Sequence, residues 1–135
     1  MIVGTSRNLA LGMLSLFLVT QPVAAQDVTT ELPKEVRALL QKEMVQVQAA
    51  MKSIHGAIVR GQHEKVRKKG QAIHDSFILE QSMTPEMRKA LKAAAPKEFL
   101  KLDQEFHGLA AQLSESGKAK DTGKQLEVFG EMTQA

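Results

Sequence analysis

The clearest pattern in the chain is a repeat of apolar positions within residues 96–116. The apolar side chains recur at alternating spacings of three and four residues, which places them along one stripe of an α-helix. A stripe this narrow can be buried only against partner helices, so the pattern predicts a helix bundle. The members of the stripe are Phe99, Leu102, Phe106, Leu109 and Leu113.

A second repeat with similar spacing predicts a first long helix over residues 32–60, with Gly61 as its C-terminal cap. A second helix is predicted over residues 62–82, where Gly70 takes a position on the apolar seam and allows a close approach of a neighbour. The stripe of the first helix is Val36, Leu40, Met44, Val47, Met51, Ile54 and Ile58, and that of the second is Val66, Ile73 and Phe77.

Threonine and proline at Thr84–Pro85 predict the start of a short helix that runs to about Ala94. Pro96 interrupts this helix, and the third long helix then runs to about Ser116. After a loop over residues 117–120, Asp121 caps a last helix that contains Leu126, Phe129 and Met132.

No strand-like alternation occurs, and the connections are short except for the excursion over residues 83–95. Short connections make neighbouring helices antiparallel. The pattern therefore predicts an all-α fold, an up-down-up-down antiparallel four-helix bundle over residues 26–135 with a shortened fourth helix.

The predicted fourth helix is only about 15 residues or ~22 Å long, shorter than its three partners. The end of the bundle that it leaves open is expected to expose apolar side chains without a fourth wall. This end is interpreted either as a bundle that lacks its last turns or as a surface covered by a dimer partner. The side chains at that end are Leu40, Met44, Phe77 and Phe99.

Residues 1–25 have the features of a signal peptide: Arg7 near the start, an apolar core, and small residues up to Ala25. An uncleaved anchor is the alternative. Cleavage near Ala25 predicts a periplasmic domain with no membrane contact. The formal net charge is only +3, and Arg7 leaves with the signal, so nucleic-acid binding is not expected. Because the chain has no cysteine, its core alone must hold it together.

Three stretches carry a resemblance to a known family: HDSFILEQ at 74–81, MTPEMRKAL at 83–91 and PKEFLKLDQEFHGLAAQL at 96–113. The segment LEVFGEMTQA at 126–135 is similar to the one that precedes a Cys-x-x-Cys-His motif in the same family. Over residues 34–135 the chain thus resembles the cytochrome c′-type family, the class II c-type cytochromes.

The resemblance implies a four-helix bundle that binds haem c and transfers single electrons to a redox partner protein. In six-coordinate members a methionine on the first helix is the sixth iron ligand, and Met44 matches it by position. Covalent attachment is not possible in this chain as given, because it has no cysteine and no histidine beyond His107. The surroundings of such a haem would be Leu40, Met44, Phe77, Phe99, Phe129 and Met132.

The sequence is expected either to stop just short of the haem motif or to belong to a protein that has lost haem. Met44 also suits an ordinary core position, since methionine fills irregular gaps. Non-covalent haem b is a third alternative, but the last helix offers no histidine ligand.

His74 and His107 are expected at the boundary of the core, with Asp103 one turn before His107 as a hydrogen-bond partner. His55 and His63 are expected to face solvent. The basic run Lys65, Arg67, Lys68 and Lys69 is interpreted as a solvated helix face or as a docking site for an acidic redox partner.

No nucleophile–base arrangement is recognisable, so an enzyme is not predicted and no catalytic residue is assigned. Two functions stay open: a cytochrome c′-like haem protein, and a haem-free periplasmic interaction bundle that forms a homodimer.

Overall fold

The computed structural model describes residues 32–135. The predicted signal peptide over residues 1–25 and the cleavage site near Ala25 lie outside the described residues, as does the start of the predicted domain at residue 26. All regular structure in the described part is helical. The six helices are α1 (Lys34–Val59), α2 (His63–His74), α3 (Leu79–Ser82), α4 (Pro85–Ala94), α5 (Lys97–Lys118) and α6 (Thr122–Met132).

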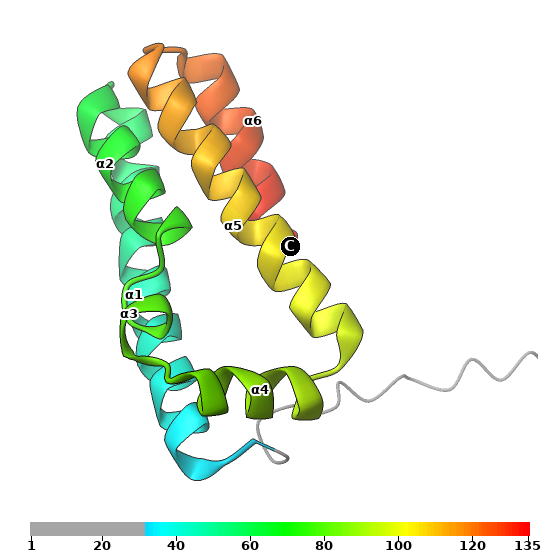
Figure 1. Ribbon diagram of the computed structural model, residues 1–135. Coiled ribbons are helices and arrows are strands. Elements are labelled where there is room, and N and C mark those ends of the chain that lie inside the picture. Colours follow the sequence, from blue (N-terminus) through cyan, green and yellow to red (C-terminus); the bar gives the residue numbers. More distant parts are fainter. Residues whose placement is uncertain (1–31) are drawn as a thin grey trace, which may run out of the picture.

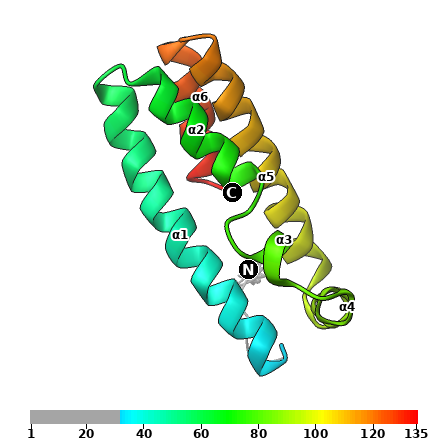
Figure 2. The same ribbon diagram turned by 60° about the vertical axis from the view of Figure 1, so that its left-hand side comes forward.

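Successive long helices run in opposite directions, and α4 crosses from the lower end of α1 to the lower end of α5 (Figure 1). α2 packs along α5, α5 along α6, and α1 along α2, while α1 also contacts α3 and α6 (Figure 2). With 11 residues, α6 is half as long as α5, which has 22. Thus α6 covers only the upper part of its neighbours (Figure 1).

The first helix ends as its sequence predicts. Gly61 has a positive φ of 63°, and its N–H donates to the carbonyl of Ile58 at 3.0 Å. The next N–H, of Gln62, donates to the carbonyl of Ala57 at 2.8 Å. This pair of bonds is the Schellman arrangement, in which glycine adopts the left-handed conformation without a Cβ clash. The turn sends α2 back along α1.

The prediction of one continuous second helix over residues 62–82 is wrong. α2 ends at His74, Ser76 has a left-handed φ of 60°, and a separate short helix, α3, follows from Leu79. The backbone groups freed by the break are bound by a carboxylate from α1, described below. Helical periodicity alone does not reveal such a break, because Phe77 continues the apolar spacing through it.

α2 and α5 approach each other closely at two glycines, Gly70 and Gly117. A Cβ on Gly70 would lie 2.9 Å from the carbonyl oxygen of Ala110 and from the backbone N of Ser114. One on Gly117 would lie 2.6 Å from the backbone N of Arg67. The expected close approach at Gly70 is confirmed. Gly117 lies within α5, so the loop predicted over residues 117–120 begins later.

The buried face of α5 is therefore not the predicted stripe of large apolar residues but a neighbouring face with smaller ones. Among the five members of the predicted stripe only Leu113 is fully buried, and Leu102 is 38% exposed. Small side chains on this face allow the backbone of α2 to approach α5. The larger apolar side chains of α5 then lie at the edge of the core, where they are only partly buried. The buried residues of α5 are Ala110, Leu113, Ser114, Ser116 and Gly117.

Two clusters of buried apolar side chains lie at the two ends of the molecule. The upper core draws on four helices, α1, α2, α5 and α6, and contains Ala50, Ile54, Ala57, Ile58, Val66, Ile73, Ala110, Leu113, Val128 and Met132. The lower core contains Leu32, Val36, Leu40 and Leu79. Partly buried side chains of α1, α4, α5 and the connection before α4 complete it: Leu39, Met83, Met87, Leu91, Ala94 and Phe99.

Candidate functional site

The six residues predicted to surround a cofactor are divided between the two cores. Leu40 is buried in the lower core, and Phe99 packs against it. Met132 is buried in the upper core, where Phe77 and Phe129 pack against it from the margin. Met44 belongs to neither core.

Met44 is 45% exposed, so the prediction that it lies on the buried stripe of the first helix is wrong. The preceding residue, Glu43, takes the buried position instead. α6 ends at Met132, which shares the upper core with Ala50, so α6 does not extend to the level of Met44. Leu102, on α5, is also left exposed.

The six side chains predicted to surround a haem are all apolar, but they do not form one cluster. The sequence has no cysteine, and α6 has no histidine. Within residues 32–135, histidine, cysteine, aspartate and glutamate side chains nowhere form a group of three that could hold a metal ion. Met44 could therefore contribute a thioether ligand only to an iron that other residues already held.

Glu43 stands out among residues 32–135, because its charged side chain is fully buried. One oxygen, Oε1, accepts from the Ser76 hydroxyl and from the backbone N–H of Phe77, both at 2.9 Å. The other, Oε2, accepts from the N–H groups of Ile78 at 2.6 Å and Leu79 at 3.3 Å. The carboxylate thus binds the unpaired N–H groups at the start of α3, as an N-cap side chain would.

Sequence reasoning missed this role, although a signal exists. Glu43 lies three residues after Leu40 and seven before Ala50, on the face of α1 that also carries Ile54 and Ala57. A charged residue on an apolar face is seldom buried without partners that satisfy it. That signal could have indicated a buried polar contact with the following helix, but not the atoms that form it.

The two central histidines meet at the crossing of α2 and α5. Nδ1 of His74 lies 3.0 Å from the carbonyl oxygen of His107. Nε2 of His107 lies 3.8 Å from Oδ1 of Asp103, so the predicted partner is near but at ion-pair rather than hydrogen-bond distance. His107 is a boundary side chain, 19% exposed, whereas His74 is more exposed than predicted.

The upper end carries a second buried polar contact. The amide of Gln125 is fully buried, and its nitrogen lies 3.1 Å from the carbonyl oxygen of Ser116 and 3.0 Å from Nδ1 of His63. His63 is thus half-buried, and the prediction that it faces solvent is wrong. His55 is exposed as expected, and its ring stacks on Phe129 with centroids 5.8 Å apart.

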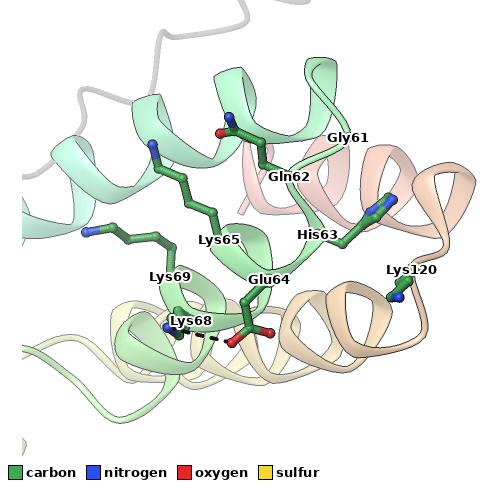
Figure 3. A pocket seen from close by; sticks show the side chains of 8 residues that line it. All are labelled: Gly61, Gln62, His63, Glu64, Lys65, Lys68, Lys69 and Lys120. Carbon is green, nitrogen blue, oxygen red and sulfur yellow. Dashed lines mark ion pairs between the residues drawn. The ribbon is translucent and has the colours of Figure 1, made fainter.

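The basic run forms an open, solvated surface at the start of α2 (Figure 3). Lys65, Lys68 and Lys69 line it together with Lys120, which comes from the turn between α5 and α6. Glu64 pairs with Arg67 at 2.7 Å and with Lys68 at 3.7 Å. The hydrogen bond from the Arg67 guanidinium holds the pKa of Glu64 below its ordinary value. Part of the basic charge is therefore compensated locally.

None of the helices in residues 32–135 is long and apolar enough to cross a membrane. Comparisons with family models, with curated proteins and with solved structures produced no significant match. The cytochrome c′ resemblance accordingly stays a prediction from the sequence.

Proposed function

We propose that this chain is an exported bundle of the cytochrome c′ type that transfers single electrons at a haem in its lower half. In this proposal α1, α2 with α3, α5 and α6 form an up-down-up-down four-helix bundle whose fourth helix is short. The observation that carries it is the pair of exposed apolar side chains Met44 and Leu102, on two helices of the half that α6 leaves uncovered. The sequence resemblance implies a haem in the same half.

The chain's own residues would supply the apolar surroundings of the haem. Leu40 and Phe99 lie on the lower-core side of the uncovered region, and Phe77, Phe129 and Met132 lie on the upper-core side. Together they would exclude water from the cofactor and hold it in a medium of low dielectric constant, which tunes its redox potential. Thiols for attachment and a proximal ligand would have to come from outside these 135 residues.

The test begins with the coding sequence downstream of codon 135, read in all three frames for Cys-x-x-Cys-His. The protein is then expressed from the genomic locus with the cytochrome c maturation machinery and exported. Absorption spectra in reducing pyridine are expected to show haem c. A folded, helical product without haem, together with no such motif downstream, would reject the proposal.

Met44→Ala provides the residue-level test. If Met44 is the sixth ligand, the substitution should change the spin state of the iron and lower its potential, because thioether ligation favours the reduced form. Val45→Ala is the matched control, since Val45 is the next residue on α1 and is 62% exposed. Equal spectra for the two variants and the unmodified protein would remove Met44 from the ligand set.

The same exposed side chains also support a second candidate, a haem-free interaction bundle that forms a homodimer. Met44 and Leu102 would then lie in a symmetric interface, where burial of their side chains would stabilise the pair. Leu102→Gln should weaken dimerisation in sedimentation experiments. Val59→Gln, at an exposed position of the opposite end, should leave it unchanged. A strictly monomeric protein would exclude this candidate.

A further inference from the structure

A cavity of about 750 Å³ lies where α4 crosses between the lower ends of the long helices. Its lining comes from the end of α2, the α2–α3 connection, α3, the stretch around α4, and the first turns of α5. None of the six residues predicted to surround a haem lines it. Its volume is within the range of natural small-molecule sites, roughly 300–1,000 Å³.

The lining combines apolar side chains with an excess of positive charge. Leu79, Met83, Leu91 and Leu100 provide the apolar part, and Arg88, Lys92 and Lys97 provide three cations. Asp103 is the one carboxylate of the lining, and it lies 3.8 Å from the imidazole of His107. With neutral histidines, the formal charge of the lining is three positive charges less one negative charge, or +2.

The start of α5 adds to the positive charge of the lining. Lys97 is the first residue of α5, and no side chain caps that helix, so its N-terminal dipole adds to the positive field at the cavity. Nδ1 of His107 is buried and forms no hydrogen bond within residues 32–135. His107 lines the cavity, but Nδ1 has almost no accessible surface and Nε2 faces Asp103, so its ring forms part of the wall.

One wall of the cavity is α4, a helix that is only partly buried. No residue of α4 is fully buried, and Met87, Leu91 and Ala94 pack only partly buried against the lower core. Its side chains Arg88, Leu91 and Lys92 line the cavity. It enters after the extended residues Met83 and Thr84 and leaves through the extended Ala95. A ligand that contacted both α4 and α5 would bury more apolar surface of α4 and so stabilise this helix.

We propose that this cavity binds an aliphatic carboxylate, with the carboxylate beside Lys92 and Lys97 and the chain along Leu79, Met83 and Leu91. No phenylalanine lines the cavity, and its rings are the imidazoles of His74 and His107. No group of three metal-ligating residues forms in residues 32–135, which disfavours a metal ion. The inference concerns a site separate from the proposed haem and does not depend on haem being bound.

The test uses the exported full chain and dodecanoate below its critical micelle concentration, with affinity measured by isothermal titration calorimetry. Saturable binding with one site per chain is expected. Dodecyltrimethylammonium has the same chain with the opposite charge and should bind at least tenfold more weakly. Acetate has the charge without the chain and should not bind measurably. Equal affinity for the two dodecyl compounds would overturn the proposal.

The double substitution Lys92→Gln with Lys97→Gln should weaken dodecanoate binding about tenfold, since each partly exposed ion pair contributes modestly. Its matched control is Lys65→Gln with Lys69→Gln, which removes the same charge at the start of α2, outside the cavity. Equal affinities of the two double variants would show that net charge alone attracts the ligand, and would contradict the assignment.

Two further readouts locate the ligand without a substitution. In ¹⁵N-labelled protein, dodecanoate should shift the imidazole resonances of His107, which lines the cavity, while those of His55 stay in place. Hydrogen exchange of α4 amides should slow severalfold, with α6 unaffected. An unshifted His107 resonance together with unchanged exchange in α4 would place any bound ligand elsewhere and reject the site.

Discussion

The upper and lower cores contain the same kinds of apolar side chain, but different sets of helices enclose them. In the upper core, side chains of α1, α2, α5 and α6 meet, and every buried member is at most 3% exposed. In the lower core, α1 meets the short helix α3 and the crossing helix α4, and Leu40 and Leu79 remain 6% and 8% exposed. Side chains from four helices that pack along one another exclude water more completely than those of one long helix, a single-turn helix and a crossing helix. Stability is therefore expected to concentrate at the upper end and binding at the lower end.

The largest effect is expected at Glu43, which holds α3 against α1. Glu43→Ala would leave the Ser76 hydroxyl and three backbone N–H groups without their acceptor. We expect a loss of about 4 kcal/mol in the free energy of unfolding, measured by urea denaturation.

Glu43→Gln is the control for this prediction, because it preserves the size of the side chain and one acceptor oxygen. It should cost roughly half as much, since its NH₂ group would face N–H donors. A loss below ~1 kcal/mol for Glu43→Ala would show that water replaces the carboxylate and that the region is already open.

Shortening one buried side chain in each core tests whether the upper core is the more rigid of the two. Ile54→Ala in the upper core should cost about 3 kcal/mol, because Ile54 is fully buried and four helices prevent collapse of the cavity. Leu40→Ala in the lower core should cost about 1.5 kcal/mol, because its surroundings can relax or admit water. Equal losses in chemical denaturation would show that the two cores are equally rigid.

A smaller effect is expected where α2 and α5 approach most closely. Gly70→Ala would place a methyl group 2.9 Å from backbone atoms of Ala110 and Ser114, which cannot move independently of α5. Overpacking of this kind should cost about 2 kcal/mol, measured as a lower urea midpoint.

Gly108→Ala is the matched control on α5, where an added Cβ would meet nothing within 4 Å. It should stabilise the protein by up to ~1 kcal/mol, because alanine favours the helix more than glycine does. If both substitutions stabilised the protein, the close approach of the two helices would be refuted.

The smallest effect concerns pH. Hydrogen bonding from Arg67 lowers the pKa of Glu64 below its ordinary value of 4.5. A carboxyl group with a lowered pKa in the folded state contributes its stability above pH 4.5 and loses it as the pH falls through the lowered pKa. The urea midpoint should therefore fall slightly more on acidification in the unmodified protein than in Glu64→Gln. Parallel pH profiles would show that this exposed pair contributes nothing.

The sequence predicted the helical class and most helix boundaries, because those depend on local spacing and on caps. Thr84 and Asp121 accept hydrogen bonds from the backbone N–H groups of Met87 and Lys124, as N-caps do, and Gly61 ends α1. The break after His74 could not be predicted, since it depends on Glu43, more than 30 residues earlier in the chain.

The candidate site was predicted less well than the helices. Periodicity alone does not distinguish Glu43 from Met44 as the buried residue, because the choice depends on what the facing helix offers. For the same reason Leu102 was expected inside, whereas small residues of α5 occupy its contact with α2. The residues that line the cavity beneath α4 carry no motif, and only the crossing of α4 brings them together.

The buried amide of Gln125 has a consequence for the order of folding. It joins His63 at the start of α2 and Ser116 near the end of α5 to α6, so three segments must meet before its hydrogen bonds can form. Because these bonds need all three segments in place, we expect the upper end to be largely native in the folding transition state. Mutations there should slow refolding, whereas mutations around α4 should mainly accelerate unfolding.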